Sequence, residues 1–266
     1  MATNTEDNYS ILDRPEVLRL LFHPRKELEA NPTGTHGIDI MIPVGKDEKI
    51  GARFHMDKKQ GPNILFFHGN GEIVADYDDL GPLYNKMGIN FLPVDYRGYG
   101  RSTGMPTVTS MMSDSLTIFN FINKWLLDHF YTGPVIIMGR SLGSASAIKI
   151  ADSYQDRISG LILESGFART EPLLRILGID PVGIGFKEMT GFQNVYKINK
   201  FDKPVLIIHA EQDHIIPFSD GQALYDACSA SDKTLLQIPG ANHNDIFMRG
   251  LSEYMAAVKA LLERIT

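Results

Sequence analysis

The sequence predicts an α/β protein in which helices cover both faces of a mostly parallel, twisted sheet. Short apolar runs alternate with helical patterns through most of the chain, which is typical of repeated strand–helix units. Residues 63–67 are apolar without a break, as expected for a strand buried on both faces. Residues 37–44 and 50–56 alternate around a short turn, which predicts an antiparallel hairpin at the N-terminal edge of the sheet.

The remaining elements follow in chain order from their periodicity. A short helix is expected before the hairpin, and the helices together are expected at residues 11–22, 77–87, 110–130, 144–154, 220–230 and 247–265. The later strands are expected at residues 89–94, 134–138, 159–163, 205–208 and 234–238. Right-handed crossovers place the carboxyl ends of the parallel strands at one edge of the sheet, where ligands bind.

The length of 266 residues fits one large α/β domain. We expect a single domain over residues 1–266, with an N-terminal extension at residues 1–36. Residues 168–200 interrupt the alternation, because they form a segment longer than one crossover helix requires. A loop of this length is usually a lid or binding element, so we expect a short cap insert here. The alternative is a helix with irregular packing and no role in selectivity.

Composition limits the classes of partner. The net charge is −6 and no run of Lys and Arg stands out, so nucleic acid is not an expected partner. The one cysteine, Cys228, cannot form an internal disulfide, which fits a reducing compartment. It lies in the helix expected at residues 220–230, where we interpret it as a small packing residue.

The N-terminal residues predict neither export nor membrane insertion. Residues 1–10 are polar and acidic, without the basic and apolar regions of a signal peptide. Charged residues interrupt the helix at 11–22, and no stretch reaches the roughly 18 apolar residues that a membrane span needs. We therefore expect a cytoplasmic protein with no transmembrane segment. No pattern indicates the oligomeric state.

The first indication of chemistry is the G-x-S-x-G pattern at residues 139–143, with Ser141 at its centre. It lies between the strand expected at 134–138 and the helix expected at 144–154, which is the arrangement of a nucleophile elbow. On such a turn the serine hydroxyl is exposed at the sheet edge, and a Cβ at either glycine position would collide with neighbouring elements. The alternative is an ordinary turn whose serine caps the helix.

A serine needs a base to take its proton, and four of the eight histidines follow strands closely. Only His243 follows the final strand, in a loop that reaches the elbow from the side. His68 and His209 lie on or near strand ends, where structural hydrogen bonds are the more common role. His214 adjoins the expected acid and is the main rival to His243.

The base in turn needs a carboxylate that fixes its tautomer and stabilises the imidazolium. Asp213 follows the strand at 205–208, and the chain order Ser141, Asp213, His243 is the one expected of an α/β hydrolase. Glu164 is the rival acid, because it ends the preceding strand. Asp245 is a weaker rival, being too close in sequence to His243 for easy approach to its ring.

Backbone donors are also expected where negative charge develops on the substrate. One is the N–H of Leu142, directly after the serine, and the other is the N–H of Asn70 in the His-Gly-Asn-Gly loop after the strand at 63–67. The flanking Gly69 and Gly71 let that loop turn freely. The loop has neither the P-loop pattern nor the dinucleotide-binding pattern of glycines.

With these residues in place, the chain resembles the serine α/β hydrolases. More narrowly, it resembles the H-G-N-type α/β-hydrolase-domain proteins near the serine aminopeptidase-like and monoglyceride-lipase-like groups. The resembling stretches are residues 66–71, 94–102, 139–144, 211–213 and 240–245. The resemblance implies the α/β-hydrolase fold, the triad and oxyanion donors named above, no cofactor and no metal. Within the second stretch we interpret Asp95 and Arg97 as structural.

The sequence therefore predicts a serine hydrolase that cleaves carboxylic esters or thioesters of small-molecule acyl substrates through an acyl-enzyme intermediate. The first alternative is a peptidase or amidase of the serine aminopeptidase type, for which Glu72, Glu164 and Glu171 are candidate groups to bind a substrate amine. The second is a non-catalytic binding protein with a hydrolase fold. All three triad residue types occur in the expected order, which argues against that second alternative.

Overall fold

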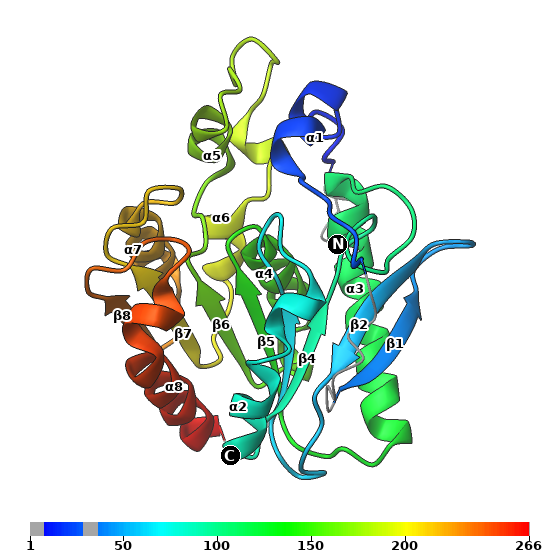
Figure 1. The fold of residues 1–266 in the computed structure, drawn as a ribbon. Helices are drawn as coiled ribbons and strands as arrows, with labels where there is room; N and C mark the ends of the chain where they lie inside the picture. The colour runs from blue at the N-terminus through cyan, green and yellow to red at the C-terminus, as the bar shows by residue number, and fades with distance from the viewer. Residues whose placement is uncertain (1–7, 29–36, 266) are drawn as a thin grey trace, which may run out of the picture.

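The computed structural model describes residues 8–28 and 37–265 (Figure 1). The acidic stretch at residues 1–7 and the part of the expected N-terminal extension at residues 29–36 lie outside the described residues, as does residue 266.

The described residues form one eight-stranded sheet with the strand order β1-β2-β4-β3-β5-β6-β7-β8. Its strands are β1 (Ile38–Pro43), β2 (Lys49–Phe54), β3 (Asn63–Phe67), β4 (Asn90–Val94), β5 (Val135–Arg140), β6 (Gly160–Glu164), β7 (Val205–Ala210) and β8 (Lys233–Ile238). β2 runs antiparallel to both of its neighbours, whereas the other pairs are parallel. The predicted mostly parallel sheet with an antiparallel hairpin at its N-terminal edge is confirmed.

Helices connect most of the parallel strands. They are α1 (Pro15–Leu21), α2 (Gly81–Lys86), α3 (Val108–Asp128), α4 (Gly143–Tyr154), α5 (Thr170–Ile176), α6 (Asn194–Ile198), α7 (Phe218–Ala227) and α8 (Ile246–Ile265), with short 3₁₀ turns η1 (Val74–Tyr77), η2 (Gln155–Arg157) and η3 (Glu188–Thr190). In Figure 1, α2 and α8 lie on the near side of the sheet, and α3 and α4 lie on its far side.

The side chains of β3 show why both faces are covered. Ile64 and Phe66 belong to a buried apolar cluster that contains residues of α2 and α8. Leu65 and Phe67 belong to a second cluster that contains residues of α3 and α4. Because successive side chains of a strand point to opposite faces, the unbroken apolar run places a hydrophobic core on each side of the sheet.

The helix expected at residues 77–87 is divided into η1 and α2. Pro82 lies at the start of α2, and Gly88 follows its end with a φ of 75°. Proline has no N–H for a helix interior and is accepted in the first turn, whereas glycine readily adopts the left-handed conformation that ends a helix. Pro15 likewise begins α1, which is shorter than the helix expected at residues 11–22.

The position of Cys228 within a helix was a wrong prediction. α7 ends at Ala227, and Cys228 has an extended backbone conformation directly after it. The polar residues that follow, Ser229, Ser231 and Asp232, favour a turn over a helix. The Ser229 hydroxyl donates to the carbonyl oxygen of Phe201 at 3.1 Å. The Cys228 side chain is nevertheless buried, as expected for a packing residue.

The insert, residues 168–200, contains α5, η3 and α6. Figure 1 shows α5 and the following loop beyond the carboxyl ends of the strands, whereas α6 lies lower, behind the sheet. α6 packs against α4 and α7, and its Asn194 donates to the carbonyl oxygen of Phe167 at 2.9 Å. The insert is thus divided between a raised part and a part that belongs to the helical layer.

Across residues 8–28 and 37–265, the structure contains no helix with both the length and the apolar character of a membrane span.

Candidate active site

Ser141 occupies a tight turn between β5 and α4. Its φ is 51°, a left-handed conformation that few residues other than glycine adopt. The Ser141 N–H donates to the carbonyl oxygen of Glu164 at 2.8 Å, which ties the turn to the end of β6. Backbone strain of this kind persists only where the surrounding structure holds it, and it clusters at functional sites.

The two glycines of the G-x-S-x-G pattern are required by close backbone packing. A Cβ on Gly139 would lie 2.3 Å from the carbonyl oxygen of Gly143, and a Cβ on Gly143 would lie 2.2 Å from that of Phe67. Both positions therefore exclude a Cβ, as expected from the sequence. At Gly143 the reason is that the turn packs directly against the end of β3.

The structure brings Ser141, His243 and Asp213 together at the carboxyl edge of the sheet. Ser141 Oγ lies 3.0 Å from Nε2 of His243, and Nδ1 of His243 lies 2.7 Å from Oδ2 of Asp213. His243 lies in the loop between β8 and α8, and Asp213 in the loop after β7. A neutral imidazole that donates from Nδ1 to the carboxylate presents Nε2 as an acceptor to the serine hydroxyl.

The Asp213 carboxylate is fixed by more than His243. Its Oδ1 accepts hydrogen bonds from the backbone N–H groups of Ile215 at 3.0 Å and Ile216 at 2.8 Å. Burial acts to raise the pKa of this carboxyl, but the hydrogen bonds from His243 and the two N–H groups outweigh it and lower the pKa below its ordinary value. Asp213 is therefore held ionised and oriented toward His243.

The other histidines that follow strands are committed elsewhere or exposed. His209 is buried and donates from Nε2 to the carbonyl oxygen of Ile216 at 2.8 Å, and burial lowers its pKa. His68 donates from Nδ1 to the carbonyl oxygen of Gly69 at 2.7 Å. His214, the main rival, has an exposed side chain. The geometry favours His243 as the partner of Ser141.

The rival acids have other partners. Glu164 accepts hydrogen bonds from Arg140 at 2.9 Å and from the Tyr254 hydroxyl at 2.8 Å. Asp245 accepts from Arg249 at 2.8 Å and from the backbone N–H of Asn242 at 2.6 Å, so it organises its own loop.

Leu142 lies on the same turn as Ser141, and Asn70 lies on the loop after β3. Asn70 follows β3, the neighbour of β5 in the sheet, and Leu142 directly precedes α4. The backbone N–H groups of both residues lack an acceptor within the part of the chain that the structure describes. Both groups are therefore unused as donors in the described structure.

A buried ionic cluster beneath the site was missed by the sequence analysis. The Arg140 guanidinium donates from Nε to Glu164, from Nη1 to Glu72, and from Nη2 to the carbonyl oxygen of His243 at 2.6 Å. The Tyr77 hydroxyl also donates to Glu72, at 2.6 Å. One cation thus joins the loops after β3 and β8 to the end of β6.

The charges in this cluster change one another's pKa values. Burial raises the pKa of Glu164 although Arg140 opposes the shift. Burial would also raise the pKa of Glu72, but the charge of Arg140 and the Tyr77 hydrogen bond lower it. The available sequence signal was a charged residue at the end of each of two apolar strands, at positions 140 and 164, because buried charges need partners.

No group of three or more His, Cys, Asp and Glu side chains with the geometry of a metal site occurs among the described residues. No residue set therefore stands out as a metal-ion ligand sphere there.

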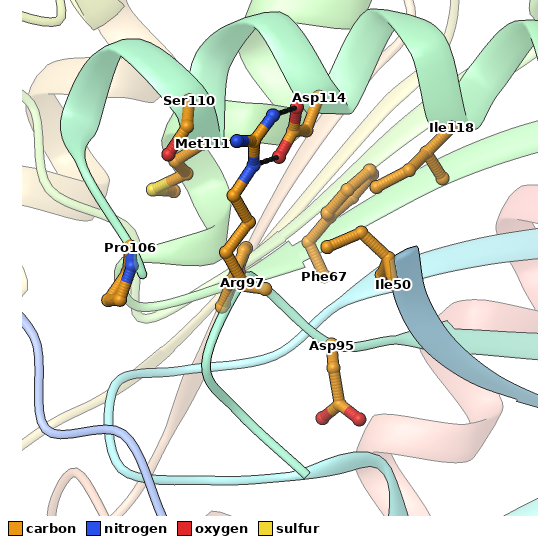
Figure 2. A pocket seen from close by; sticks show the side chains of 10 residues that line it. Ile50, Phe67, Asp95, Arg97, Pro106, Ser110, Met111, Asp114 and Ile118 are labelled. Atoms are coloured by element: carbon orange, nitrogen blue, oxygen red, sulfur yellow. Dashed lines mark hydrogen bonds and ion pairs between the residues drawn. The ribbon is translucent and has the colours of Figure 1, made fainter. Parts of the chain in front are cut away.

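Arg97 and Asp95 make structural contacts. Figure 2 shows the Arg97 guanidinium directed at Asp114 on α3, with hydrogen bonds of 2.7 and 2.9 Å. Asp95 accepts from the backbone N–H of Val74 at 3.0 Å. The small pocket drawn there has no room for a water molecule, and these contacts support the structural interpretation of both residues.

A larger pocket of about 350 Å³ lies along the insert. Met189 of η3 and Val195 and Tyr196 of α6 line it, together with Ala227 at the end of α7. Neither Ser141 nor His243 is among its lining residues, so this pocket is not the space directly around the serine.

A family model described as serine aminopeptidase, S33, matches residues 59–180 and 189–247, which is more than half of the chain. The chain belongs to this family. The S33 match contains all five residues predicted as triad members and oxyanion donors, and its gap falls within the insert. The superfamily of serine α/β hydrolases, expected from the resemblance, is thereby confirmed.

Curated relatives agree with the superfamily assignment. Protein bem46 of Schizosaccharomyces pombe is 30% identical over 191 residues, which cover 69% of this chain and 62% of that protein. Human alpha/beta hydrolase domain-containing protein 17B is 30% identical over 215 residues, covering 76% of this chain and 66% of that protein. The chain thus spans a little under two thirds of the length of these relatives.

Solved structures confirm the α/β-hydrolase fold of this S33 member. An esterase from Pyrococcus furiosus is similar with a TM-score of 0.72 and 19% identity, covering 91% of this chain and 99% of that one. Est1E from Butyrivibrio proteoclasticus, with ferulic acid bound, is similar with a TM-score of 0.70 and 22% identity, covering 85% of this chain and 98% of that one.

Proposed function

We propose that the chain is a serine hydrolase that cleaves carboxylic esters or thioesters. The observation that carries the proposal is the series of contacts from Ser141 Oγ to His243 Nε2, at 3.0 Å, and from His243 Nδ1 to Asp213 Oδ2, at 2.7 Å. The same three residue types, in this mutual geometry, perform acyl transfer on several unrelated folds.

The proposed reaction has two halves. In the first, Ser141 Oγ attacks the acyl carbonyl carbon while His243 takes the hydroxyl proton and Asp213 stabilises the imidazolium. The N–H groups of Asn70 and Leu142 donate to the oxyanion, and His243 then gives its proton to the leaving alcohol or thiol. In the second half, water attacks the acyl-enzyme with His243 as base, and release of the carboxylic acid restores Ser141.

Amide or peptide hydrolysis is the second candidate, because the matching family is described as a serine aminopeptidase. An aminopeptidase needs an acceptor for the substrate ammonium. Of the three carboxylates considered from the sequence, Glu72 and Glu164 are bonded to Arg140, and Glu171 accepts from Arg175 at 2.8 Å. Since these groups already have cationic partners, we favour esters and thioesters.

We further propose that the insert acts as a short cap that shapes the pocket for a small-molecule acyl substrate. Its raised part, which includes α5, lies beyond the carboxyl ends of the strands (Figure 1), on the edge of the sheet that carries Ser141. A cap in this place would limit the length and branching of the acyl chain.

The experiment is labelling with a fluorophosphonate probe combined with turnover of p-nitrophenyl acetate. We expect the probe to modify Ser141, and Ser141→Ala to abolish both labelling and turnover. Ser146→Ala is the matched control, because Ser146 is a buried serine of α4 whose hydroxyl has no hydrogen-bond partner in the described structure. That variant should keep both activities.

Two outcomes would contradict parts of the proposal. A folded wild-type protein that neither reacts with the probe nor hydrolyses the ester would exclude the serine hydrolase function. Faster turnover of aminoacyl amides than of the matching acyl esters and thioesters would instead assign the site to the aminopeptidase reaction.

A further inference from the structure

The N-terminal segment, residues 8–28, is anchored beside the proposed site. Leu12 and Val17 are fully buried in the core. Asp13 accepts from the backbone N–H of Val108 at 2.7 Å, at the start of α3. Farther along, the carbonyl oxygen of Arg25 accepts from the N–H of Gly100 at 2.9 Å. His23 lies between these anchors, so its backbone is held on both sides.

The side-chain amide of Asn70 is bonded to this segment. Its Oδ1 accepts from the backbone N–H of His23 at 2.8 Å and from the Tyr99 hydroxyl at 2.6 Å. Its Nδ2 donates to Nδ1 of the His23 ring at 2.8 Å. His23 therefore contacts both ends of the amide, across 47 positions of sequence.

These bonds are compatible with one arrangement of the amide. Two donors converge on Oδ1, so a flipped amide would turn its NH₂ group toward the His23 N–H and lose that bond. Nδ2 can donate to the ring only if Nδ1 carries a lone pair. Burial raises the pKa of Tyr99, which keeps its hydroxyl protonated as a donor to Asn70.

Glycines on both sides of Asn70 make contacts from outside its loop important for its backbone position. Gly69 and Gly71 flank Asn70, and Gly71 has a φ of 77° with no atom near the place of a Cβ. Glycines permit many backbone conformations, so the bonds to the Asn70 side chain restrict its peptide in addition to the local bond from the Gly69 N–H to Glu72 at 2.6 Å. Arg25 adds a second contact from the same segment, because its Nε donates to the carbonyl oxygen of Gly71 at 2.9 Å.

We propose that His23 is a positioning residue for the hydrolase reaction. By holding the Asn70 side chain, it fixes the backbone N–H of Asn70 where the oxyanion forms. The inference rests on the proposed function, in which this N–H is an oxyanion donor. It assigns a role in the reaction to a residue outside the S33 family match, which begins at residue 59.

The expected effect is on the transition state more than on substrate binding. A donor that is moved by about 1 Å can lose about a hundredfold in rate, and a removed oxyanion donor costs about 10²–10³ in kcat. Loss of the His23 ring leaves the N–H of Asn70 in place but less constrained. We therefore expect kcat to fall about tenfold to a hundredfold, with KM changed by less than about threefold.

The test compares His23→Leu with His23→Asn and Lys26→Met in the full chain. The leucine variant removes the acceptor for Asn70, whereas the asparagine variant restores an acceptor oxygen near the position of Nδ1. Lys26→Met removes a different anchor of the same segment, the bond from Lys26 Nζ to the carbonyl oxygen of Ser102 at 2.7 Å, and leaves the Asn70 contacts in place. His23 is exposed, so its replacement leaves no cavity and the variants should fold.

Ester turnover gives kcat and KM, and nuclear magnetic resonance follows the backbone and side-chain N–H signals of Asn70. The proposal requires a lower kcat and shifted Asn70 signals in His23→Leu, with both restored in His23→Asn and unchanged in Lys26→Met. Wild-type kcat in His23→Leu would overturn it. Equal losses in all three variants would also overturn it, because they would indicate general loosening of the segment.

Failure of the proposed function gives a different result. If the wild-type protein shows no Ser141-dependent turnover, the hydrolase function is wrong and no role for His23 in that reaction survives. If turnover depends on Ser141 while the Asn70 signals and kcat are unchanged in His23→Leu, the proposed function stands and the positioning role is wrong.

Discussion

Nη2 of Arg140 donates a hydrogen bond of 2.6 Å to the carbonyl oxygen of His243. Arg140 directly precedes the proposed nucleophile, and His243 is the proposed base. The same guanidinium is bonded to Glu72 and Glu164, so the residue next to Ser141 links the loops after β3 and β8 to the end of β6. A planar group with several fixed donors suits this role better than the single ammonium of a lysine.

Replacement of this arginine should destabilise the protein strongly. Arg140→Met leaves Glu164 fully buried, and Glu72 partly buried, without their cation. Breaking a buried ion pair by removing one partner costs about 3–5 kcal/mol. We expect a loss of this size in the free energy of unfolding, measured with urea at neutral pH.

A surface arginine provides the control. Arg264 donates to Asp232 at 2.9 Å, but both side chains are partly exposed. Arg264→Met should cost about 0–1 kcal/mol, because exposed pairs are solvated and contribute little. Equal effects of the two substitutions would contradict a structural role for the buried cluster.

Gly143→Ala should disturb the contact between α4 and β3. The added methyl group would meet the carbonyl oxygens of Phe67 and His68 at 2.2 and 2.7 Å. Both are backbone atoms that cannot rotate away, so the helix or the loop that carries Asn70 has to shift. Overpacking of this kind costs about 1–3 kcal/mol, and we expect ester turnover to fall with the stability.

Gly45→Ala is the matched control for this substitution. A Cβ on Gly45 would also come within 2.2 Å of an atom, but that atom is the end of the flexible Glu48 side chain. The side chain can rotate aside, so the urea midpoint should stay close to that of the wild-type protein. A loss as large as that of Gly143→Ala would show that the backbone carbonyl oxygens of Phe67 and His68 are not what makes position 143 sensitive.

The shifted pKa of Asp213 predicts how stability depends on pH. Its folded-state pKa is lowered by hydrogen bonds, whereas an unfolded aspartate has a pKa of about 3.9. The ionised carboxylate therefore contributes its full stability above about pH 3.9, and the contribution is lost as the pH falls through the lower folded-state value.

Urea unfolding of the wild-type protein and Asp213→Asn, from about pH 7 to about pH 3, tests this sign. The wild-type advantage should be constant near neutrality and shrink at the acidic end. Asp202→Asn is the control, because Asp202 is exposed and its ion pair with Lys203 is long at 3.9 Å and solvated. An Asp213 advantage that grows on acidification would mean that its pKa is raised.

The sequence predicted much of the sheet because apolar runs and turns are local signals. The residues proposed for catalysis could be predicted for a related reason: each follows a strand, and parallel strands end at the same edge of the sheet. Placement of the strands therefore brings Ser141, Asp213 and His243 to one edge of the sheet, which allows them to meet. Their hydrogen-bonded geometry agrees with that expectation.

The contacts that support the site could not be predicted in the same way. Arg140 and Glu72 are 68 positions apart, and His23 and Asn70 are 47 positions apart. A single sequence shows which charges and amides exist but not which of them meet. The start of a separate helix near Pro82 was indicated by a local signal, which the sequence analysis did not use.

Burial should protect Cys228 from thiol reagents. Its side chain is buried, and that burial raises the pKa of the thiol. Since the thiolate is the reactive form, both effects should slow its reaction with Ellman's reagent in the native protein. Addition of urea should accelerate the reaction in parallel with global unfolding.

The double variant Cys228→Ala/Ser231→Cys moves the thiol to an exposed position three residues away. That thiol should react rapidly in the native state, because solvent reaches it and no burial disfavours the thiolate. If native Cys228 reacts equally fast, the turn after α7 opens locally at low free energy.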